Sequence, residues 1–144
     1  MSHQQNVKMA NASLIGGLNH LQVVIKAFVR NPPRDEESHK KWSAQVVEAI
    51  KMKVVVGPFA KYVSSCGNAG VTGGCIIETS HLISHVWDEI SPAMVQLDCY
   101  SCSYFDEEVI VEKLKEFDLV SFELMLIDRN EGFKVLRHLE RTVQ

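Results

Sequence analysis

Side chains that can do chemistry are concentrated in the middle of the chain. A glycine-rich run at residues 70–74 (GVTGG) and a short apolar run are followed by residues 78–87, ETSHLISHVW. A serine and two histidines thus lie in a segment whose apolar residues indicate core. Cys99 and Cys102 follow downstream. These residue types can bind a metal, exchange thiols, or act as nucleophile and base.

One candidate is a zinc site formed by His81, His85, Cys99 and Cys102, because two imidazoles and two thiols are a zinc ligand set. Both pairs, however, lie in segments predicted to be strands, where Cys99 and Cys102, three positions apart, project from opposite faces. The cysteine spacing also fits a redox pair, but such pairs usually begin a helix. We therefore do not expect a bound metal. The zinc site and the redox pair remain as alternatives.

A third candidate is self-cleavage at Ser80. A serine hydroxyl can attack the carbonyl carbon that precedes its own nitrogen, which replaces the Thr79–Ser80 amide by an ester. Nearby glycines allow the unusual backbone angles of a strained turn. A base that removes the Cα proton of the serine would then leave dehydroalanine, and hydrolysis would give a pyruvoyl group. Residue spacing alone does not favour this chemistry over the other two.

Residues 71–102 resemble a known family. Residues 71–89 (VTGGCIIETSHLISHVWDE) are similar to the signature of the short prokaryotic-type S-adenosylmethionine decarboxylases, in which V-S-G and an apolar run precede E-S-H-L and I-H-T-W-P-E. Residues 98–102 (DCYSC) look like the D-x-F-T-C segment of that family. The resemblance implies a pyruvoyl-dependent decarboxylase that cuts itself between residues 79 and 80, giving fragments 1–79 and 80–144.

The resemblance assigns roles to single residues. Ser80 matches the serine that becomes the pyruvoyl cofactor, and Thr79 precedes the cleaved bond. His85 matches a histidine that assists processing. Cys102 matches the cysteine that protonates the product carbon.

Three further positions are carried over in the same way. Thr72 stands where the family has a processing serine, and it keeps the hydroxyl. Glu89 matches the glutamate that holds the ribose hydroxyls of the substrate. Tyr62 is matched, across an insertion, to an aromatic residue that stacks on adenine.

The chain also departs from the family pattern. Thr79 replaces a glutamate, Asp88 replaces a proline, and residues 20–24 (HLQVV) lack the acidic residue usual after H-L. We expect decarboxylation of S-adenosylmethionine for polyamine synthesis. Two alternatives are the same pyruvoyl chemistry on a basic amino acid, ornithine or arginine, and an unprocessed, inactive regulatory homologue.

The elements that must position these residues follow from hydrophobic periodicity and turn signals. Five strands are predicted: residues 18–29, residues 53–63 with a bulge at Gly57-Pro58, a strand that begins at residue 75, residues 93–103 and residues 119–127. Two helices are predicted, one that follows an N-cap at Asp35 and one at residues 106–117. Residues 64–74 are expected to be a loop, residues 1–16 a polar lead-in, and residues 133–144 a helical tail.

This order, β-α-β-β-β-α-β, predicts an α+β two-layer sandwich: a largely antiparallel sheet with two helices on one face. Something must cover the other face of the sheet as well. We therefore expect a homodimer or a higher homo-oligomer.

Composition limits the class of protein further. The 144 residues fit a single domain, and 46% are apolar. The net charge is −3 and the 15 basic residues are scattered, so we expect no nucleic-acid partner but a small cationic substrate. The N-terminus lacks a signal-peptide pattern, and no apolar run is long enough to span a membrane, so we expect a cytoplasmic protein with reduced cysteines.

Overall fold

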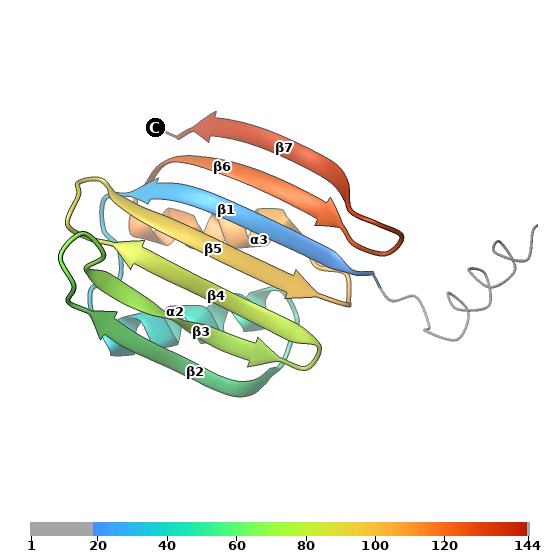
Figure 1. Cartoon of the computed structure of the whole chain (residues 1–144), viewed down its shortest axis with the longest axis horizontal. Helices are drawn as coiled ribbons and strands as arrows, with labels where there is room; N and C mark the ends of the chain where they lie inside the picture. Colours follow the sequence, from blue (N-terminus) through green and yellow to red (C-terminus); the bar gives the residue numbers. More distant parts are fainter. Residues whose placement is uncertain (1–18, 144) are drawn as a thin grey trace, which may run out of the picture.

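Seven antiparallel strands form one sheet in the part of the chain that the structure describes, residues 19–143 of a computed structural model (Figure 1). The strands are β1 (Leu21–Val29), β2 (Val54–Val63), β3 (Gly70–Ile77), β4 (Ser80–Trp87), β5 (Ala93–Ser101), β6 (Leu119–Asp128) and β7 (Lys134–Thr142). Their order across the sheet is β2-β3-β4-β5-β1-β6-β7. The first strand in the sequence therefore lies inside the sheet, between β5 and β6.

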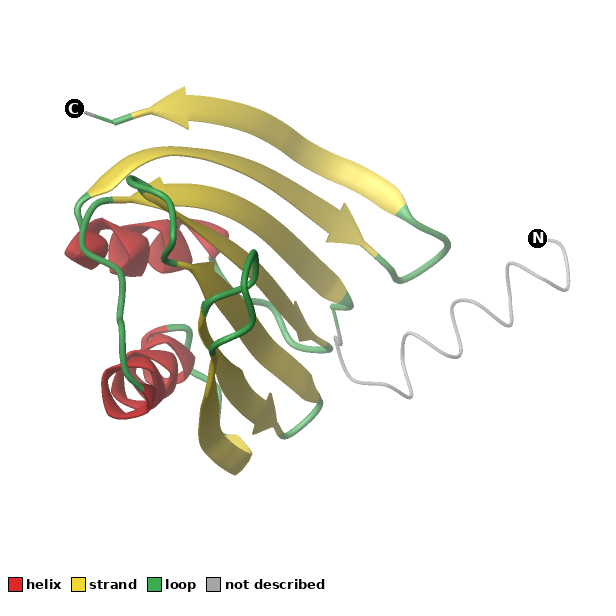
Figure 2. Cartoon of the chain, turned by 60° about the vertical axis from the view of Figure 1, so that its left-hand side comes forward, coloured by secondary structure: helices red, strands yellow, loops and turns green. Residues whose placement is uncertain are grey.

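Two helices, α2 (Glu36–Ala49) and α3 (Glu107–Leu114), pack on one face of the sheet, and a 3-10 turn, η1 (Lys115–Phe117), follows α3 (Figure 2). No described helix lies over the opposite face, which we call the open face. The predicted α+β two-layer sandwich is confirmed. Within residues 19–143, neither helix has the length and apolar character needed to cross a membrane.

The predicted loop at residues 64–74 is wrong in its second half. Residues 70–74 begin β3, and a turn at Glu78 and Thr79 separates β3 from β4, so one more strand precedes β5 than predicted. The glycines allow the close approach of these strands. A Cβ added at Gly74, whose φ is +157°, would lie 1.9 Å from the carbonyl oxygen of Leu82.

The predicted helical tail is also wrong, because residues 134–142 form strand β7. Pairing with the edge of β6 and contacts to α3 stabilise the extended conformation of this segment. Arg137 of β7 donates hydrogen bonds to Glu107 and, at 2.8 Å, to Glu108 of α3. The predicted lead-in at residues 1–16 lies outside the described residues.

Local signals for the ends and irregularities of the elements are confirmed. The Asp35 side chain accepts a hydrogen bond of 2.7 Å from the backbone N–H of Ser38, which caps α2 and lowers the pKa of that carboxyl. Asp106 caps α3 in the same way, through the N–H of Glu108 at 3.0 Å. Gly57, with a φ of +111°, lies where the register of β2 against β3 shifts.

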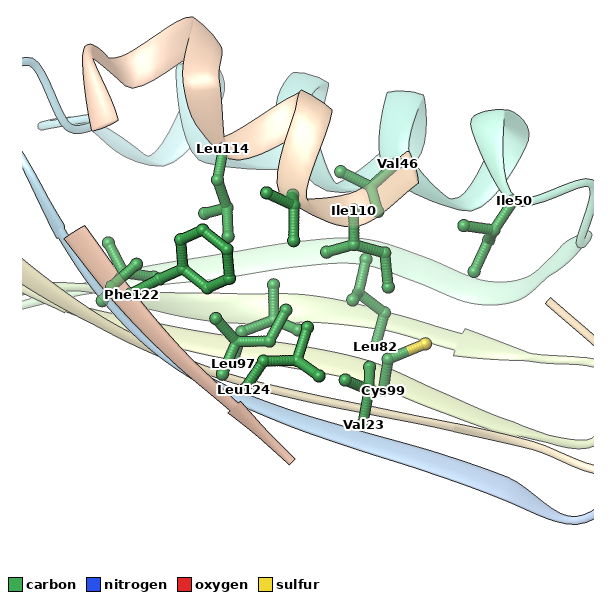
Figure 3. Close-up of a cluster of buried hydrophobic side chains, with 14 of the residues drawn as sticks. Val23, Val46, Ile50, Leu82, Leu97, Cys99, Ile110, Leu114, Phe122 and Leu124 are labelled. Carbon is green, nitrogen blue, oxygen red and sulfur yellow. The ribbon is translucent and has the colours of Figure 1, made fainter. Parts of the chain in front are cut away.

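The hydrophobic core lies between the helices and the sheet (Figure 3). Alternate residues of the central strands point into it, as the period-two pattern of a half-buried strand requires. The side chains drawn from the strands include Val23, Leu82, Leu97, Cys99, Phe122 and Leu124, and those from the helices include Val46, Ile50, Ile110 and Leu114.

One histidine is buried in this core. His39 of α2 is fully buried; its Nε2 lies 2.9 Å from the Ser84 hydroxyl and its Nδ1 lies 3.3 Å from the Ser43 hydroxyl. Burial, and secondarily the charge of His85, lowers the pKa of His39 to about 4. The fold therefore requires the neutral imidazole.

Acidification should destabilise the fold through His39. Because the pKa falls from 6.5 to about 4 on folding, the contribution of His39 is complete above about pH 6.5 and is lost as the pH falls toward 4. The shift corresponds to roughly 3 kcal/mol. Wild type should exceed His39→Gln in stability by more at pH 7 than at pH 4, measured by urea unfolding at both values. A difference that stays constant with pH would contradict this role.

Candidate active site

The Thr79–Ser80 peptide bond lies at a tight turn. Ser80 pairs with Ile77 across β3 and β4, so Glu78 and Thr79 alone make the turn. Thr79 is exposed and Ser80 is half-buried. The N–H of Glu78 donates to the carbonyl of Lys53 at 3.2 Å, which ties the turn to the start of β2. The bond predicted to be cut is therefore accessible and lies outside the central part of the sheet.

A chain of polar contacts runs from Ser80 onto the open face. The Ser80 hydroxyl lies 3.3 Å from Nδ1 of His81, and Nε2 of the same ring lies 3.1 Å from a carboxylate oxygen of Asp98 on β5. The side-chain amide of Gln22 on β1 donates to both oxygens of Asp98 at 3.1 Å. A serine hydroxyl, an imidazole and a carboxylate are thus connected in series.

Cys102 lies at the same end of the sheet as Ser80. His81 pairs with Tyr100, so the next residue along β5, Ser101, lies beside Ser80, and Cys102 follows directly. Cys102 is half-buried, and its carbonyl accepts a hydrogen bond of 3.0 Å from Asn19.

The other cysteine of the pair points the opposite way. Cys99 is buried in the core, and burial together with the negative charge of Asp98 raises its pKa to about 12. Of the two cysteines, Cys102 is therefore the one whose thiol lies outside the core, at the same end of the sheet as Ser80.

Tyr100 lies at the centre of a further cluster next to Ser80. Its hydroxyl lies 2.8 Å from Nδ1 of His20, and the guanidinium carbon of Arg129 lies 4.1 Å from its ring centre. Arg129 also donates to the side-chain oxygen of Gln22 at 3.5 Å. The strand ends that surround Ser80 thus carry a cation, an aromatic ring and two imidazoles.

Thr72 and His85 face each other across β3 and β4, far from the turn. Nε2 of His85 lies 3.1 Å from the carbonyl oxygen of Asn68, and the His85 ring meets Trp87 edge-on with centres 4.3 Å apart. Because a carbonyl can only accept, Nε2 carries the proton in the neutral ring, and Nδ1 is the nitrogen that can act as a base.

The two predicted substrate contacts already have partners within the chain. The Glu89 carboxylate accepts hydrogen bonds of 3.0 Å from the backbone N–H groups of Gly67 and Ala69, and so organises the loop before β3. The Tyr62 hydroxyl donates to Asp88 at 3.1 Å, and this hydrogen bond is the main cause of the raised pKa of Tyr62.

The predicted site residues therefore fall into two groups in one chain. Thr79, Ser80 and Cys102 lie at the turn end of β4, whereas Thr72, His85, Tyr62 and Glu89 lie at its other end. His85 follows Ser80 by five residues, which is roughly 16 Å along a strand. The two side chains also alternate onto opposite faces.

The zinc alternative has no support in residues 19–143, where no three His, Cys, Asp or Glu side chains are arranged to hold a metal ion. Cys99 points into the core, whereas His81 and His85 lie on the open face, so the four candidate ligands do not converge.

A surface concavity of about 440 Å³ lies elsewhere, over β1, β6 and β7. It is lined by Lys26, Phe28, Ser121, Phe122, Glu123, Glu140, Arg141 and Thr142, and it includes none of the predicted site residues.

Sequence reasoning missed the neighbours of Ser80. Asp98 was recognised only as part of a motif, and neither Gln22 nor Arg129 was singled out. The polar residues that alternate with apolar ones in β1 and β5 are a signal for an open sheet face. Which of them meet depends on strand order, which one sequence does not give.

The comparison with protein families identifies the class. Residues 20–130 match the model of S-adenosylmethionine decarboxylase, a decarboxylase family. The chain belongs to the S-adenosylmethionine decarboxylase family, as the resemblance of residues 71–102 predicted.

The fold agrees with this assignment. The structure is similar to the crystal structure of the adenosylmethionine decarboxylase from Aquifex aeolicus VF5, with a TM-score of 0.59 and 13% sequence identity. The similarity covers 83% of this chain and 96% of that chain, and at this identity it shows a shared fold. No curated protein matches the chain.

Alkylation of the folded protein should label Cys66 and Cys102 and spare Cys75 and Cys99. The first two side chains are exposed or half-buried, whereas the last two are buried and burial raises their pKa. Iodoacetamide treatment followed by peptide mass spectrometry measures this, with guanidinium-unfolded protein as the control in which all four react. Equal labelling of Cys99 and Cys102 in the folded protein would contradict the structure.

Proposed function

We propose that this chain is a self-processing, pyruvoyl-dependent decarboxylase that converts S-adenosylmethionine to decarboxylated S-adenosylmethionine, a precursor for polyamine synthesis. The position of Ser80 carries the proposal: its peptide bond to Thr79 lies in an exposed turn, and its hydroxyl is 3.3 Å from an imidazole nitrogen. The Cys102 thiol at the same strand ends and the membership of the family support it.

Processing requires two bond-breaking steps. First, the Ser80 oxygen attacks the carbonyl carbon of Thr79, and the C–N bond breaks as the C–O bond forms, which leaves an ester and a free amino group. Second, a base removes the Cα proton of residue 80 and the Thr79 carboxylate leaves. The resulting dehydroalanine tautomerises to an imine, takes up water and releases ammonia, so that fragment 80–144 begins with a pyruvoyl group.

Cys102 is the proton donor that the geometry favours in the decarboxylation. The pyruvoyl group at residue 80 would supply a carbonyl that binds the substrate amine and accepts the electrons released as CO2 leaves. The substrate α-carbon then needs one proton. The Cys102 thiol follows the strand position beside residue 80, whereas the Cys99 thiol lies in the core.

A second copy of the chain would complete the processing site. Within one chain, Thr72 and His85 lie roughly 16 Å from Ser80, too far for a hydrogen bond. The open face carries half-buried apolar side chains such as Val24 and Met125 and has no described helix over it. Two copies could pair through their open faces about a two-fold axis. The turn that holds Ser80 in one copy would then lie over the end of β4 that holds His85 in the other copy.

This pairing assigns the remaining processing roles. Nδ1 of the second copy's His85 would remove the Cα proton of residue 80. The hydroxyl of the second copy's Thr72 would donate a hydrogen bond to the oxyanion that forms on the Thr79 carbonyl.

Aromatic surface near Glu89 favours an adenosyl substrate over ornithine or arginine. Tyr62 is 38% exposed on β2 and its hydroxyl contacts Asp88, the neighbour of Glu89, and Trp87 lies beside His85. Flat rings of this kind stack on a nucleobase, which a basic amino acid lacks. Glu89 keeps further acceptor capacity for ribose hydroxyls beyond its two loop contacts.

Purified protein should consist of two fragments, 1–79 and 80–144. Intact-mass measurement should find the second fragment about 17 Da lighter than the serine-started peptide, because the water lost in elimination is regained in hydrolysis and the net loss is one ammonia. Ser80→Ala, which lacks the nucleophile, should stay uncut. A wild-type chain that remains at 16.2 kDa for days would instead identify an unprocessed homologue.

Two defective variants should restore cleavage when they are made together. Ser80→Ala keeps His85, and His85→Ala keeps Ser80, so a mixed pair contains one intact combination of Ser80 and His85. Co-expression with different tags should therefore produce cut His85→Ala chains, whereas His85→Ala alone should accumulate a hydroxylamine-sensitive ester. Mass spectrometry of the separated chains measures both. Absence of cleavage in the mixed pair would exclude a shared site.

Cys102→Ala should be processed but should decarboxylate S-adenosylmethionine ~10²–10⁴-fold more slowly, the range typical of a lost general acid. Released CO2 measures this, with Cys66→Ala as a matched control that leaves the rate unchanged because Cys66 is exposed in a loop. The same assay with ornithine, arginine and lysine should give no CO2. Turnover of arginine or ornithine in place of S-adenosylmethionine would exclude the proposed substrate.

A further inference from the structure

The polar chain that begins at Ser80 connects four residues on three neighbouring strands of the sheet. Ser80 and His81 belong to β4, Asp98 to β5 and Gln22 to β1. The contacts run from the Ser80 hydroxyl to Nδ1 of His81, from Nε2 of His81 to Asp98, and from Asp98 to the Gln22 amide. Neither the family match nor the fold comparison assigns a role to this arrangement.

We propose that His81, oriented by Asp98, is the base that activates the Ser80 hydroxyl in the first step of self-cleavage. This inference rests on the proposed function, and it assigns a step that His85 of the same chain cannot perform. His85 lies roughly 16 Å from Ser80 along the strand. Nδ1 of His81, in contrast, lies 3.3 Å from the Ser80 hydroxyl oxygen that reacts.

The partner of Nε2 determines which nitrogen is basic. An ionised carboxylate only accepts hydrogen bonds, so the contact of 3.1 Å to Asp98 places the His81 proton on Nε2. Nδ1 then carries the lone pair and faces the Ser80 hydroxyl. This is the tautomer that a general base requires, and the carboxylate also stabilises the imidazolium that forms.

Asp98 is itself held in place. Gln22 donates to both of its carboxylate oxygens at 3.1 Å, and the side-chain oxygen of Gln22 accepts from Arg129 at 3.5 Å. The Asp98 and His81 side chains are 42% and 37% exposed, so the pair alone contributes little to stability. The contact instead orients the His81 ring, so Asp98 is a positioning residue.

Ser80 and His81 together account for every proton that moves in this step. The Ser80 hydroxyl gives its proton to Nδ1 of His81 as its oxygen bonds to the Thr79 carbonyl carbon. His81 then returns that proton to the Ser80 nitrogen as the C–N bond breaks. The products are the Thr79 ester and a neutral amine, with no net proton gained or lost.

Cleavage that depends on a neutral imidazole should slow at low pH. The groups that face His81 are Asp98 and Tyr100 on β5 and Ser80 on its own strand, while β3 presents the apolar Ile76. Beyond Tyr100 lie His20 and Arg129, which contact that tyrosine.

The test follows cleavage of freshly translated, labelled chains over time. His81→Gln can keep a donor toward Asp98 but has no basic nitrogen near Ser80, and it should slow ester formation by about 10²-fold or more. It should accumulate no hydroxylamine-sensitive ester, in contrast to His85→Ala. Asp98→Asn should slow the same step by about 10-fold, within the range for loss of an orienting partner. Added imidazole should partly rescue His81→Gly.

His138→Gln is the matched control. His138 also lies in the sheet beside a carboxylate, at 2.7 Å from Glu123, but on the distant strand β7, so its loss should leave cleavage unchanged. The wild-type rate should fall as the pH is lowered, whereas the residual rate of His81→Gln should not follow that fall. Circular dichroism confirms that each variant is folded.

The outcomes separate this inference from the proposed function. If wild type is cut and a folded His81→Gln is cut at the same rate, or accumulates the ester, the role of His81 is excluded and the proposed function stands. If His81→Gln does not fold, the absence of imidazole rescue in His81→Gly together with a pH-independent wild-type rate excludes it. If wild type itself remains uncut, both fail.

Discussion

The hydrogen-bonded register between β4 and β5 determines which side chains meet at the candidate site. It pairs His81 with Tyr100 and Ile83 with Asp98, so that Ser80 and Cys102 reach the same end of the sheet. Because side chains alternate between the two faces, a shift of one residue would turn His81 toward the core and Leu82 toward solvent. Such a shift would take the His81 imidazole away from the Asp98 carboxylate, which it reaches across the two strands. The proposed chemistry therefore depends on this pairing.

Burial on the helix side stabilises that register. Leu82 and Val86 of β4 belong to the core, and Ser84 between them contacts the buried imidazole of His39 at 2.9 Å. A buried hydroxyl without its partner would cost free energy, so this polar pair favours one alignment of β4 under α2. On the open face, the polar residues of the same strand remain available for chemistry. One strand thus supplies both the anchor to the core and the reactive side chains.

The sequence suggested the residues of the candidate site but not their arrangement. The motif identified Ser80, and the N-cap at Asp35 and the irregularity at Gly57 followed from local rules. The turn at Glu78 and Thr79 lacks the glycine, asparagine or proline that marks most hairpins, so the separation of β3 from β4 could not be inferred. The contact between His81 and Asp98 joins residues 17 positions apart and depends on strand register. Strand β7 was missed because its edge pairing is a tertiary effect.

The predicted residues separate into two groups, so the proposed function requires two copies of the chain: the end that holds Ser80 and Cys102 would meet the end that holds Thr72 and His85 of the other copy. The central claim, that residue 80 becomes the reactive carbonyl, has a direct test. Processed protein is incubated with S-adenosylmethionine and sodium cyanoborohydride, which reduces a Schiff base to a stable amine, and the masses of the two fragments are measured by mass spectrometry. The account predicts a substrate-derived mass increase on fragment 80–144 and none on fragment 1–79. An unmodified fragment 80–144, or an increase carried by another part of the chain, would contradict it.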